Sequence, residues 1–157
     1  MRRADDRDST TLHANCVLLG EAGVLIRGPS GSGKSALARS LVAAEELGGG
    51  YAAHVADDRV VVRLWRDRLV AEPHPAIAGV FEMRGLGLVS ASPHASAAVL
   101  RLVVDLVDET PRFPEPDGLD AELLGIRLAR VRAARADAAA LAMWRLRGRD
   151  DTPVTVP

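Results

Sequence analysis

The sequence has few aromatic residues, one cysteine and no long hydrophobic run. Phe, Trp and Tyr make up 3% of its 157 residues, so a core must be built from Ala, Val and Leu. The lone Cys16 excludes an intramolecular disulfide and a cysteine-based metal cluster, and a reducing compartment such as the cytoplasm is expected. No apolar run reaches the roughly 18 residues of a membrane helix, and residues 1–11 are too charged for a secretory signal. The net charge of -1 argues against a general nucleic-acid binder.

Lysine is almost absent as well. Of the 20 basic residues, 19 are arginine, and the only lysine is Lys34. A compact ammonium fits between phosphate oxygens where a planar guanidinium does not. The lone lysine therefore directs attention to the segment around it, although an arginine-rich composition can leave one lysine by chance.

The remaining composition, with 48% hydrophobic and 26% charged residues, is typical of one globular domain, here residues 1–157. Strands are expected over 14–19, 24–27, 51–56, 60–64, 68–71 and 100–107, a strand pair over 123–131, and helices over 34–46 and 133–146. Flexible ends are expected at 1–11 and 148–157. Residues 81–89, with two glycines, are expected to be more loop than regular element. Several strands are joined by hairpin turns, which favours an α/β fold with a mixed sheet.

A glycine-rich segment separates the first strand pair from the first helix. It reads Gly28-Pro29-Ser30-Gly31-Ser32-Gly33-Lys34-Ser35 and fits the pattern G-x-x-x-x-G-K-[ST]. Glycines let the backbone curl so that its N–H groups point at phosphate oxygens, and the helix N-terminus adds a favourable dipole. Lys34 would reach the β- and γ-phosphates, and the Ser35 hydroxyl would bind Mg²⁺. The alternative is a glycine-rich turn that holds no ligand.

Acidic residues that a phosphate site needs lie further along the chain. Asp57 and Asp58 follow the strand at 51–56, where a P-loop protein has its second acidic motif. Both can face the phosphates only if the strand has ended, because adjacent strand residues point opposite ways; the alternative is an exposed turn. Glu82 and Arg84, taken alone, indicate no more than a surface ion pair. The four histidines show no metal-ligand spacing.

Together these motifs resemble the C-terminal catalytic domain of bacterial HPr kinase/phosphorylase. His13 stands fifteen residues before Gly28, where that family has a histidine. The segment 54–60, HVADDRV, resembles the family segment that ends in two aspartates. The segment 81–89, FEMRGLGLV, resembles the signature E-x-R-G-L-G-hydrophobic and is the most specific match. The resemblance runs from His13 to at least Arg112, about two thirds of the chain.

The resemblance implies an α/β P-loop kinase-like fold with a mixed sheet, similar to the HPr kinase catalytic domain and to PEP carboxykinase. It implies ATP and Mg²⁺ as cofactors and the phosphocarrier protein HPr as substrate. It also implies a homo-oligomer, a hexamer in the family, that has no nucleic-acid or membrane partner.

The resemblance further implies roles for single residues. Those assigned to catalysis are His13, Lys34, Asp57, Asp58 and Arg112. Lys34 would stabilise the transferring phosphoryl group, and Asp58 would deprotonate the acceptor serine with Asp57 assisting at the metal. Arg112 matches a family arginine through a looser alignment. Those assigned to the metal are Ser35 and Glu82.

The sequence departs from the family pattern near its end. Larger members have an N-terminal domain. This sequence is expected to lack it and so resembles the short form found in alphaproteobacteria. The larger members also carry a P-V-x-x-G-R-N-type loop linked to dephosphorylation, whereas residues 130–137 read RVRAARAD. The arginines between 127 and 149 form either a solvated helix face or a docking surface for an acidic partner. The predicted function is a Mg²⁺-ATP-dependent serine kinase for HPr with weak or no phosphorylase activity. The alternatives are a small-metabolite P-loop kinase and a nucleotide-binding regulatory module.

Overall fold

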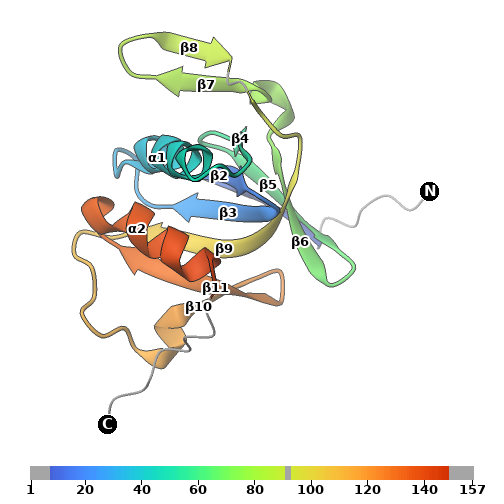
Figure 1. Ribbon diagram of the computed structural model, residues 1–157. Helices are drawn as coiled ribbons and strands as arrows, with labels where there is room; N and C mark the ends of the chain where they lie inside the picture. Colours follow the sequence, from blue (N-terminus) through green and yellow to red (C-terminus); the bar gives the residue numbers. More distant parts are fainter. Residues whose placement is uncertain (1–7, 91–92, 149–157) are drawn as a thin grey trace.

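The computed structural model describes residues 8–90 and 93–148 and is built around one large mixed sheet (Figure 1). The sheet runs in the order β1-β5-β6-β9-β3-β2-β4, and the pair β10–β11 joins it because β11 is hydrogen-bonded to β9. Its strands are β1 (Ser9–Leu12), β2 (Ala14–Leu19), β3 (Ala22–Arg27), β4 (Ala52–Ala56), β5 (Val60–Trp65), β6 (Arg68–Pro73), β9 (Ala98–Leu106), β10 (Asp120–Leu123) and β11 (Ile126–Ala133). The strands β3, β9 and β11 are parallel neighbours and the other pairs are antiparallel, so the predicted mixed sheet is confirmed.

Two helices cover one face of this sheet. They are α1 (Lys34–Leu47) and α2 (Arg135–Leu146). Alternation along β3 sends Val24 and Ile26 toward the helices, where they pack with Leu41 in the first core cluster. Leu25 points to the opposite face and packs with Leu69 in the second cluster, which β5 and β6 cover. The strand ends that carry the glycine-rich loop are therefore fixed by packing on both faces.

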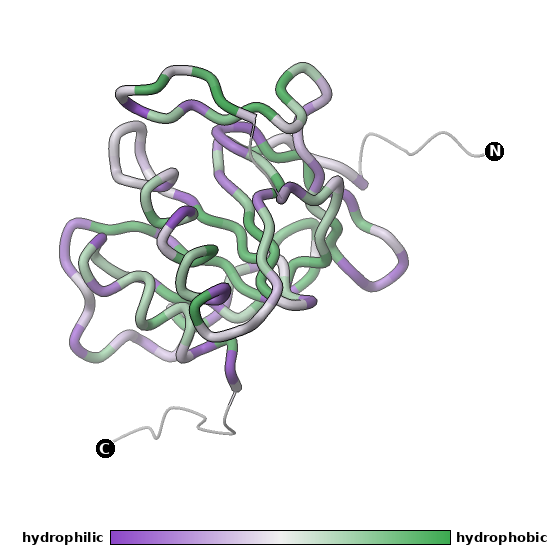
Figure 2. The backbone as a smooth tube through the Cα atoms, turned by 45° about the horizontal axis from the view of Figure 1, so that its top comes forward, coloured by the Kyte–Doolittle hydropathy of each residue, from purple (hydrophilic) through white to green (hydrophobic). Residues whose placement is uncertain are grey.

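The core consists of small and branched aliphatic residues, as the composition predicts. Among the described residues, the buried hydrophobic side chains are those of Ala, Val, Leu and Ile together with Cys16. Figure 2 shows mostly hydrophobic segments in the middle of the molecule, with most hydrophilic segments at its periphery and further hydrophobic stretches at the top. The Cys16 thiol is fully buried, and burial raises its pKa to about 12. Within the described residues no helix is long and apolar enough to cross a membrane.

An ion network lies at the carboxyl ends of the parallel strands, on the face opposite the helices. The Nε and Nη2 atoms of Arg27 donate to the two carboxylate oxygens of Asp105 at 2.7 and 2.8 Å. Arg130 Nε donates to Asp105 Oδ2 at 2.7 Å. Burial alone would raise the pKa of Asp105, but the hydrogen bonds and charges of both arginines outweigh it, and the pKa is lowered.

Residues 9–11 form a strand, and the prediction that they fray is wrong. β1 pairs antiparallel with β5, with Ser9 opposite Arg63 and Leu12 opposite Val60. A short polar segment has no periodicity of its own, and the free edge of β5 supplies its hydrogen-bond partners. Of the other residues in the predicted flexible ends, 1–7 and 149–157 lie outside the described residues.

Residues 81–89 are also more regular than predicted. They belong to a separate two-stranded hairpin, β7 (Val80–Met83) and β8 (Gly87–Ser90), which lies above the helices at the top of Figure 1. Gly85 and Gly87 have φ values of 94° and 83°, so these glycines make the turn instead of breaking the strands. The predicted strand pair at 123–131 is present with wider bounds, as β10 and β11. Short 3₁₀ helices span Pro75–Ile77 and Pro116–Leu119.

Candidate active site

The glycine-rich loop connects the end of β3 to the start of α1. Gly31 and Gly33 have φ values of 79° and 101°, a left-handed conformation that other residues rarely adopt. A side chain at Gly28 would lie 2.6 Å from the Ser32 hydroxyl. The curl that the pattern predicts is therefore present, and it depends on glycine at these positions.

The loop and the first turn of α1 are suited to an anion. Gly33 caps α1 without a side-chain hydrogen bond and the first turn has no acidic residue, so no side chain of that turn competes with an anion for its N–H groups. The Ser32 hydroxyl is buried with no hydrogen-bond partner. Lys34 is 7% exposed, and its Nζ donates to the Gly28 and Pro29 carbonyls at 2.9 and 3.1 Å. An ammonium has three donors, so one remains for a phosphate oxygen.

A carboxylate and a hydroxyl meet beside the loop. β4 ends at Ala56, so Asp57 and Asp58 are free of the strand and both line the same cleft. The Ser35 hydroxyl donates to Asp57 Oδ1 at 2.9 Å. In the described part of the chain, no group of three or more His, Cys, Asp or Glu side chains is arranged to hold a metal. The Asp57 carboxylate and the Ser35 hydroxyl are enough for Mg²⁺, which binds through one or two carboxylates and fills its other positions with water and phosphate oxygens.

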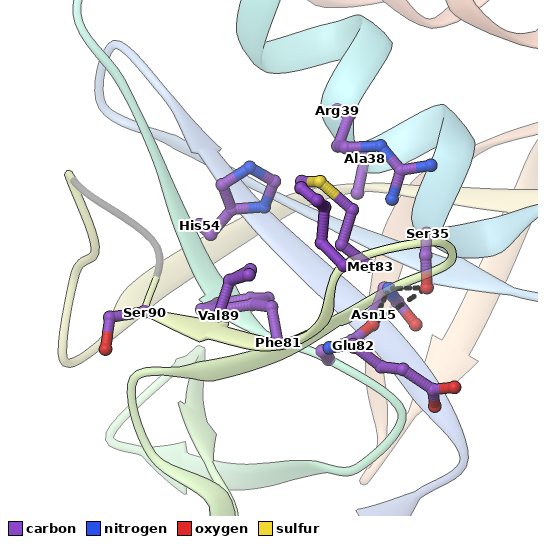
Figure 3. Close-up of a pocket in the computed structure, with 12 residues that line it drawn as sticks. Asn15, Ser35, Ala38, Arg39, His54, Phe81, Glu82, Met83, Val89 and Ser90 are labelled. Atoms are coloured by element: carbon purple, nitrogen blue, oxygen red, sulfur yellow. Dashed lines mark hydrogen bonds between the residues drawn. The ribbon is translucent and has the colours of Figure 1, made fainter.

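Asn15 ties these groups together, and the sequence analysis did not single it out. It is 2% exposed, at the start of β2 and under the first turn of α1. Its Nδ2 donates to Asp57 Oδ1 at 2.6 Å and to Ser35 Oγ at 3.2 Å (Figure 3). Its Oδ1 accepts the Asp58 backbone N–H at 3.2 Å. The buried Asn15 amide thus holds the two candidate metal ligands, Ser35 and Asp57, and the turn at Asp58 in place.

Asp58 adopts a strained backbone conformation next to a histidine. Its φ is 65°, which is uncommon for any residue other than glycine but is tolerated by Asp and Asn. The conformation turns the side chain toward His13, whose Nε2 lies 2.5 Å from Asp58 Oδ1. The two side chains are 54% and 67% exposed, so an acceptor can approach them from solvent.

The cleft has a volume of about 470 Å³ and collects most of the predicted site residues. Its walls include His13, Ser30, Gly31, Gly33, Lys34, Ser35, Asp57, Asp58 and Glu82. Glu82 comes from the hairpin, and its backbone N–H donates to Asp57 Oδ2 at 3.1 Å. The hairpin therefore completes the cleft opposite the glycine-rich loop.

Two arginines differ from the sequence-based expectation. Arg112 is exposed in the loop after β9, does not line the cleft, and has its guanidinium carbon 5.5 Å from the centre of the Phe113 ring. Arg135, the first residue of α2, does line the cleft. Its side chain crosses Gly33 so closely that a Cβ there would lie 2.9 Å from the arginine Cδ. The signal for Arg135 was its place in the arginine-rich region, but only the fold brings that region to the loop.

The family is decided by a match over most of the chain. Residues 7–121 match the model of the HPr Serine kinase C-terminal domain. The chain belongs to this family. The HPr kinase/phosphorylase of Mycoplasma mycoides subsp. mycoides SC is 29% identical over 115 residues, which is 72% of this chain and 35% of that protein. The chain thus spans about a third of the length of that curated relative.

A solved structure of the family has the same fold. It is the Hpr(Ser) kinase/phosphatase from Coxiella burnetii, which is 22% identical and superposes with a TM-score of 0.70. The match covers 88% of this chain and 94% of that one. The α/β architecture with a mixed sheet, which the resemblance implies, is therefore confirmed.

Proposed function

We propose that the chain is a Mg²⁺-ATP-dependent protein serine kinase that phosphorylates HPr. The observation that carries the proposal is the meeting of three elements in one cleft: the glycine-rich loop, the Ser35–Asp57 pair, and Asp58 beside His13. Membership of the HPr kinase family supports HPr as the acceptor.

The loop would bind the phosphates of ATP. Its backbone N–H groups and the first turn of α1 surround the anion, and Lys34 reaches the β- and γ-phosphates from the floor of the loop. Ser35, Asp57 and Glu82 would hold Mg²⁺, which when bound neutralises charge on the phosphate oxygens. Arg135, lying across Gly33, adds a cation to the cleft on the side of the glycine-rich loop, in addition to Lys34, Arg39 and Arg84.

Asp58 would accept the proton of the acceptor serine. A general base must lie within hydrogen-bond reach of the hydroxyl, and Asp58 is exposed at the mouth of the cleft. His13 orients the carboxylate through its Nε2 contact, and Asn15 holds the backbone N–H of the same residue. The serine oxygen then attacks the γ-phosphorus, and the bond to the ADP oxygen breaks.

The remaining features of this proposal follow the sequence. The chain would act in the cytoplasm as one kinase domain of residues 1–157, as a homo-oligomer, with weak or no phosphorylase activity. The last point is supported by the departure of residues 130–137 from the P-V-x-x-G-R-N-type loop.

The test is transfer of label from γ-labelled ATP, with Mg²⁺, to purified HPr of the same organism. The control is HPr with its acceptor serine changed to alanine. We expect label on the wild-type acceptor only. Absence of label with tight ATP binding would contradict the proposal and favour a nucleotide-binding regulatory module. Label on a small molecule without a protein acceptor would favour a metabolite kinase.

A further inference from the structure

A second cavity lies under the β7–β8 hairpin, next to the cleft. Its volume is about 320 Å³, at the small end of the range of ligand pockets, about 300–1,000 Å³. The hairpin contributes Phe81, Met83 and Val89 to its wall, and α1 and β4 contribute Ala38 and His54 (Figure 3). The cavity is therefore mostly apolar.

Strand alternation explains which hairpin side chains face the cavity. Phe81 pairs with Val89 across the two strands, and both point toward His54 in Figure 3. Glu82 and Leu88 form the next pair and belong to the other face, where Leu88 is 76% exposed. The Phe81 ring lies 5.0 Å from the His54 ring. Within the described residues, neither core cluster includes a hairpin side chain, so this apolar face is not used to build the core.

The cavity is continuous with the proposed phosphate site. Asn15, Ser35, Arg39, Asp57 and Glu82 line both spaces. Ser35, Asp57 and Glu82, which would hold Mg²⁺, would lie at the terminal phosphates of ATP, where the acceptor oxygen attacks. The nucleobase lies at the other end of the triphosphate. The proposed base Asp58 lines the cleft and not the cavity, but its chain neighbour Asp57 lines both, which places the cavity beside the acceptor end of the cleft.

The groups in the cavity favour an uncharged occupant. Burial lowers the pKa of His54, an effect that the nearby Asp57 opposes in part, so the neutral imidazole is favoured. Of the charged groups, Arg39 and Glu82 are exposed at the rim. Asp57 already accepts hydrogen bonds from Asn15, Ser35 and the Glu82 N–H. An apolar side chain that enters the cavity would leave no buried charge without a partner.

We propose that this cavity is an acceptor subsite that takes an apolar side chain close to the phosphorylated serine of the protein substrate. The inference rests on the proposed kinase function and adds the source of its specificity. A protein acceptor delivers its hydroxyl together with the neighbouring side chains, and the cavity is the apolar space beside the point of attack. Phe81, Met83 and Val89 are then specificity-determining residues, distinct from the groups that bind phosphate.

Two aspartate variants on neighbouring residues of β8 test the subsite. Val89→Asp places a charge in the cavity, and Leu88→Asp makes the same change on the opposite face of the same strand. We expect Val89→Asp to raise the KM for HPr at least about tenfold. A single methylene group added to or removed from the ligand of a hydrophobic pocket already changes discrimination by about tenfold or more, and a buried charge is a larger change. The Kd for ATP should stay within about twofold. Leu88→Asp adds a carboxylate opposite Glu82, so the Kd for ATP is compared without Mg²⁺ and the KM for HPr at saturating Mg²⁺. Under these conditions both quantities should stay near their wild-type values.

If Val89→Asp does not fold, the subsite can still be tested with the kinase variant Met83→Ala and with variants of HPr. Met83→Ala removes apolar wall without adding charge and should raise the KM for HPr with kcat nearly unchanged. With wild-type kinase, replacing the apolar residues near the acceptor serine by Asp, one at a time, should identify one position that raises KM equally. At that position, combining the HPr change with Met83→Ala should raise the KM by less than the product of the two separate increases, because the two side chains would be in contact.

The outcomes separate the subsite from the kinase function. Equal KM values for Val89→Asp and Leu88→Asp, with intact transfer, would overturn the subsite alone. Weakened ATP binding in Val89→Asp with an unchanged KM for HPr would assign the cavity to the nucleotide and overturn it as well. Failure of the wild-type chain to label the HPr serine would overturn the proposed function and the subsite with it.

Discussion

Hydrophobic side chains are mostly buried in the body of the sheet and partly or largely exposed in the β7–β8 hairpin. In the body, Leu25, Leu41 and Leu102 are 0% exposed and belong to the two core clusters. In the hairpin, Leu86 and Leu88 are 72% and 76% exposed. The body holds the loop, Asn15 and Asp57 on strand and helix ends that are packed on both faces. The hairpin meets that body through the Glu82 N–H bond to Asp57 and the Phe81–His54 contact. In the proposed mechanism most of the reacting groups lie on the packed body, whereas Glu82 and the proposed acceptor subsite lie on a part with few buried contacts.

The largest expected effect is in the body, at Lys34. Lys34→Ala should lower phosphoryl transfer by about 10³-fold or more, because it removes the ammonium that reaches the β- and γ-phosphates. Single-turnover transfer from γ-labelled ATP measures this loss. Lys34→Arg is the matched variant and should also fail, because a planar guanidinium does not replace a point charge in the loop. Unchanged turnover in Lys34→Ala would remove the loop from the mechanism.

Asp58→Asn should reduce transfer by about 10²–10⁴-fold, the contribution of a general base. Asn tolerates the φ of 65° at this position, so the backbone and the Asn15 hydrogen bond are retained. ATP affinity, measured by calorimetry, should stay close to wild type. Normal transfer in this variant would show that another group accepts the proton.

Stability separates the two regions directly. Leu41→Ala should lower the free energy of unfolding by about 2–5 kcal/mol, since the side chain is fully buried in the first core cluster. Leu88→Ala, at an exposed hairpin position, should change it by less than about 0.5 kcal/mol. Urea unfolding of both variants measures the contrast. Equal losses would mean that the hairpin is part of the cooperative core.

Asn15→Leu should weaken divalent-metal binding about 10- to 100-fold, the usual effect of removing a group that orients metal ligands. Leucine has a similar shape but offers no donor to Asp57 or Ser35. Mn²⁺ binding in the presence of ADP, followed by electron paramagnetic resonance, gives the affinity without requiring turnover. Val17→Ala, two residues along the same strand face, should destabilise the fold and leave Mn²⁺ affinity intact. Equal metal affinity in Asn15→Leu and wild type would reduce Asn15 to a packing role.

The smallest expected effect concerns the ion network on the far face of the body. Asp105→Asn should lower the free energy of unfolding at neutral pH by about 1–2 kcal/mol, because Arg27 and Arg130 lose a charged acceptor but are a quarter or more exposed. The lowered pKa of Asp105 fixes the pH dependence. Its contribution is complete above the unfolded pKa of about 3.9 and is lost as pH falls through the lower folded pKa. Thermal unfolding from pH 7 to pH 2 should show the two proteins converging in acid.

The sequence predicts the parts of this molecule that local patterns encode. The loop, the helix after it, the strand ending before Asp57 and the mixed character of the sheet all follow from spacing and turn residues. β1 could not be found this way, because its partner β5 lies about fifty residues away in the chain. The sequence predicts a loop at 81–89 because Gly85 and Gly87 give the same signal whether they interrupt strands or join them. Asn15 and Arg135 reach the cleft only through tertiary packing.

The buried thiol of Cys16 has a practical consequence. A thiol with a pKa near 12 carries almost no thiolate at neutral pH, and the core shields it from reagents. Since the sequence has no other cysteine, a cysteine introduced at position 88 would be the sole target of a maleimide label. The native protein is thus ready for site-directed fluorophores or spin labels on the hairpin, which would report whether that segment moves when an acceptor arrives.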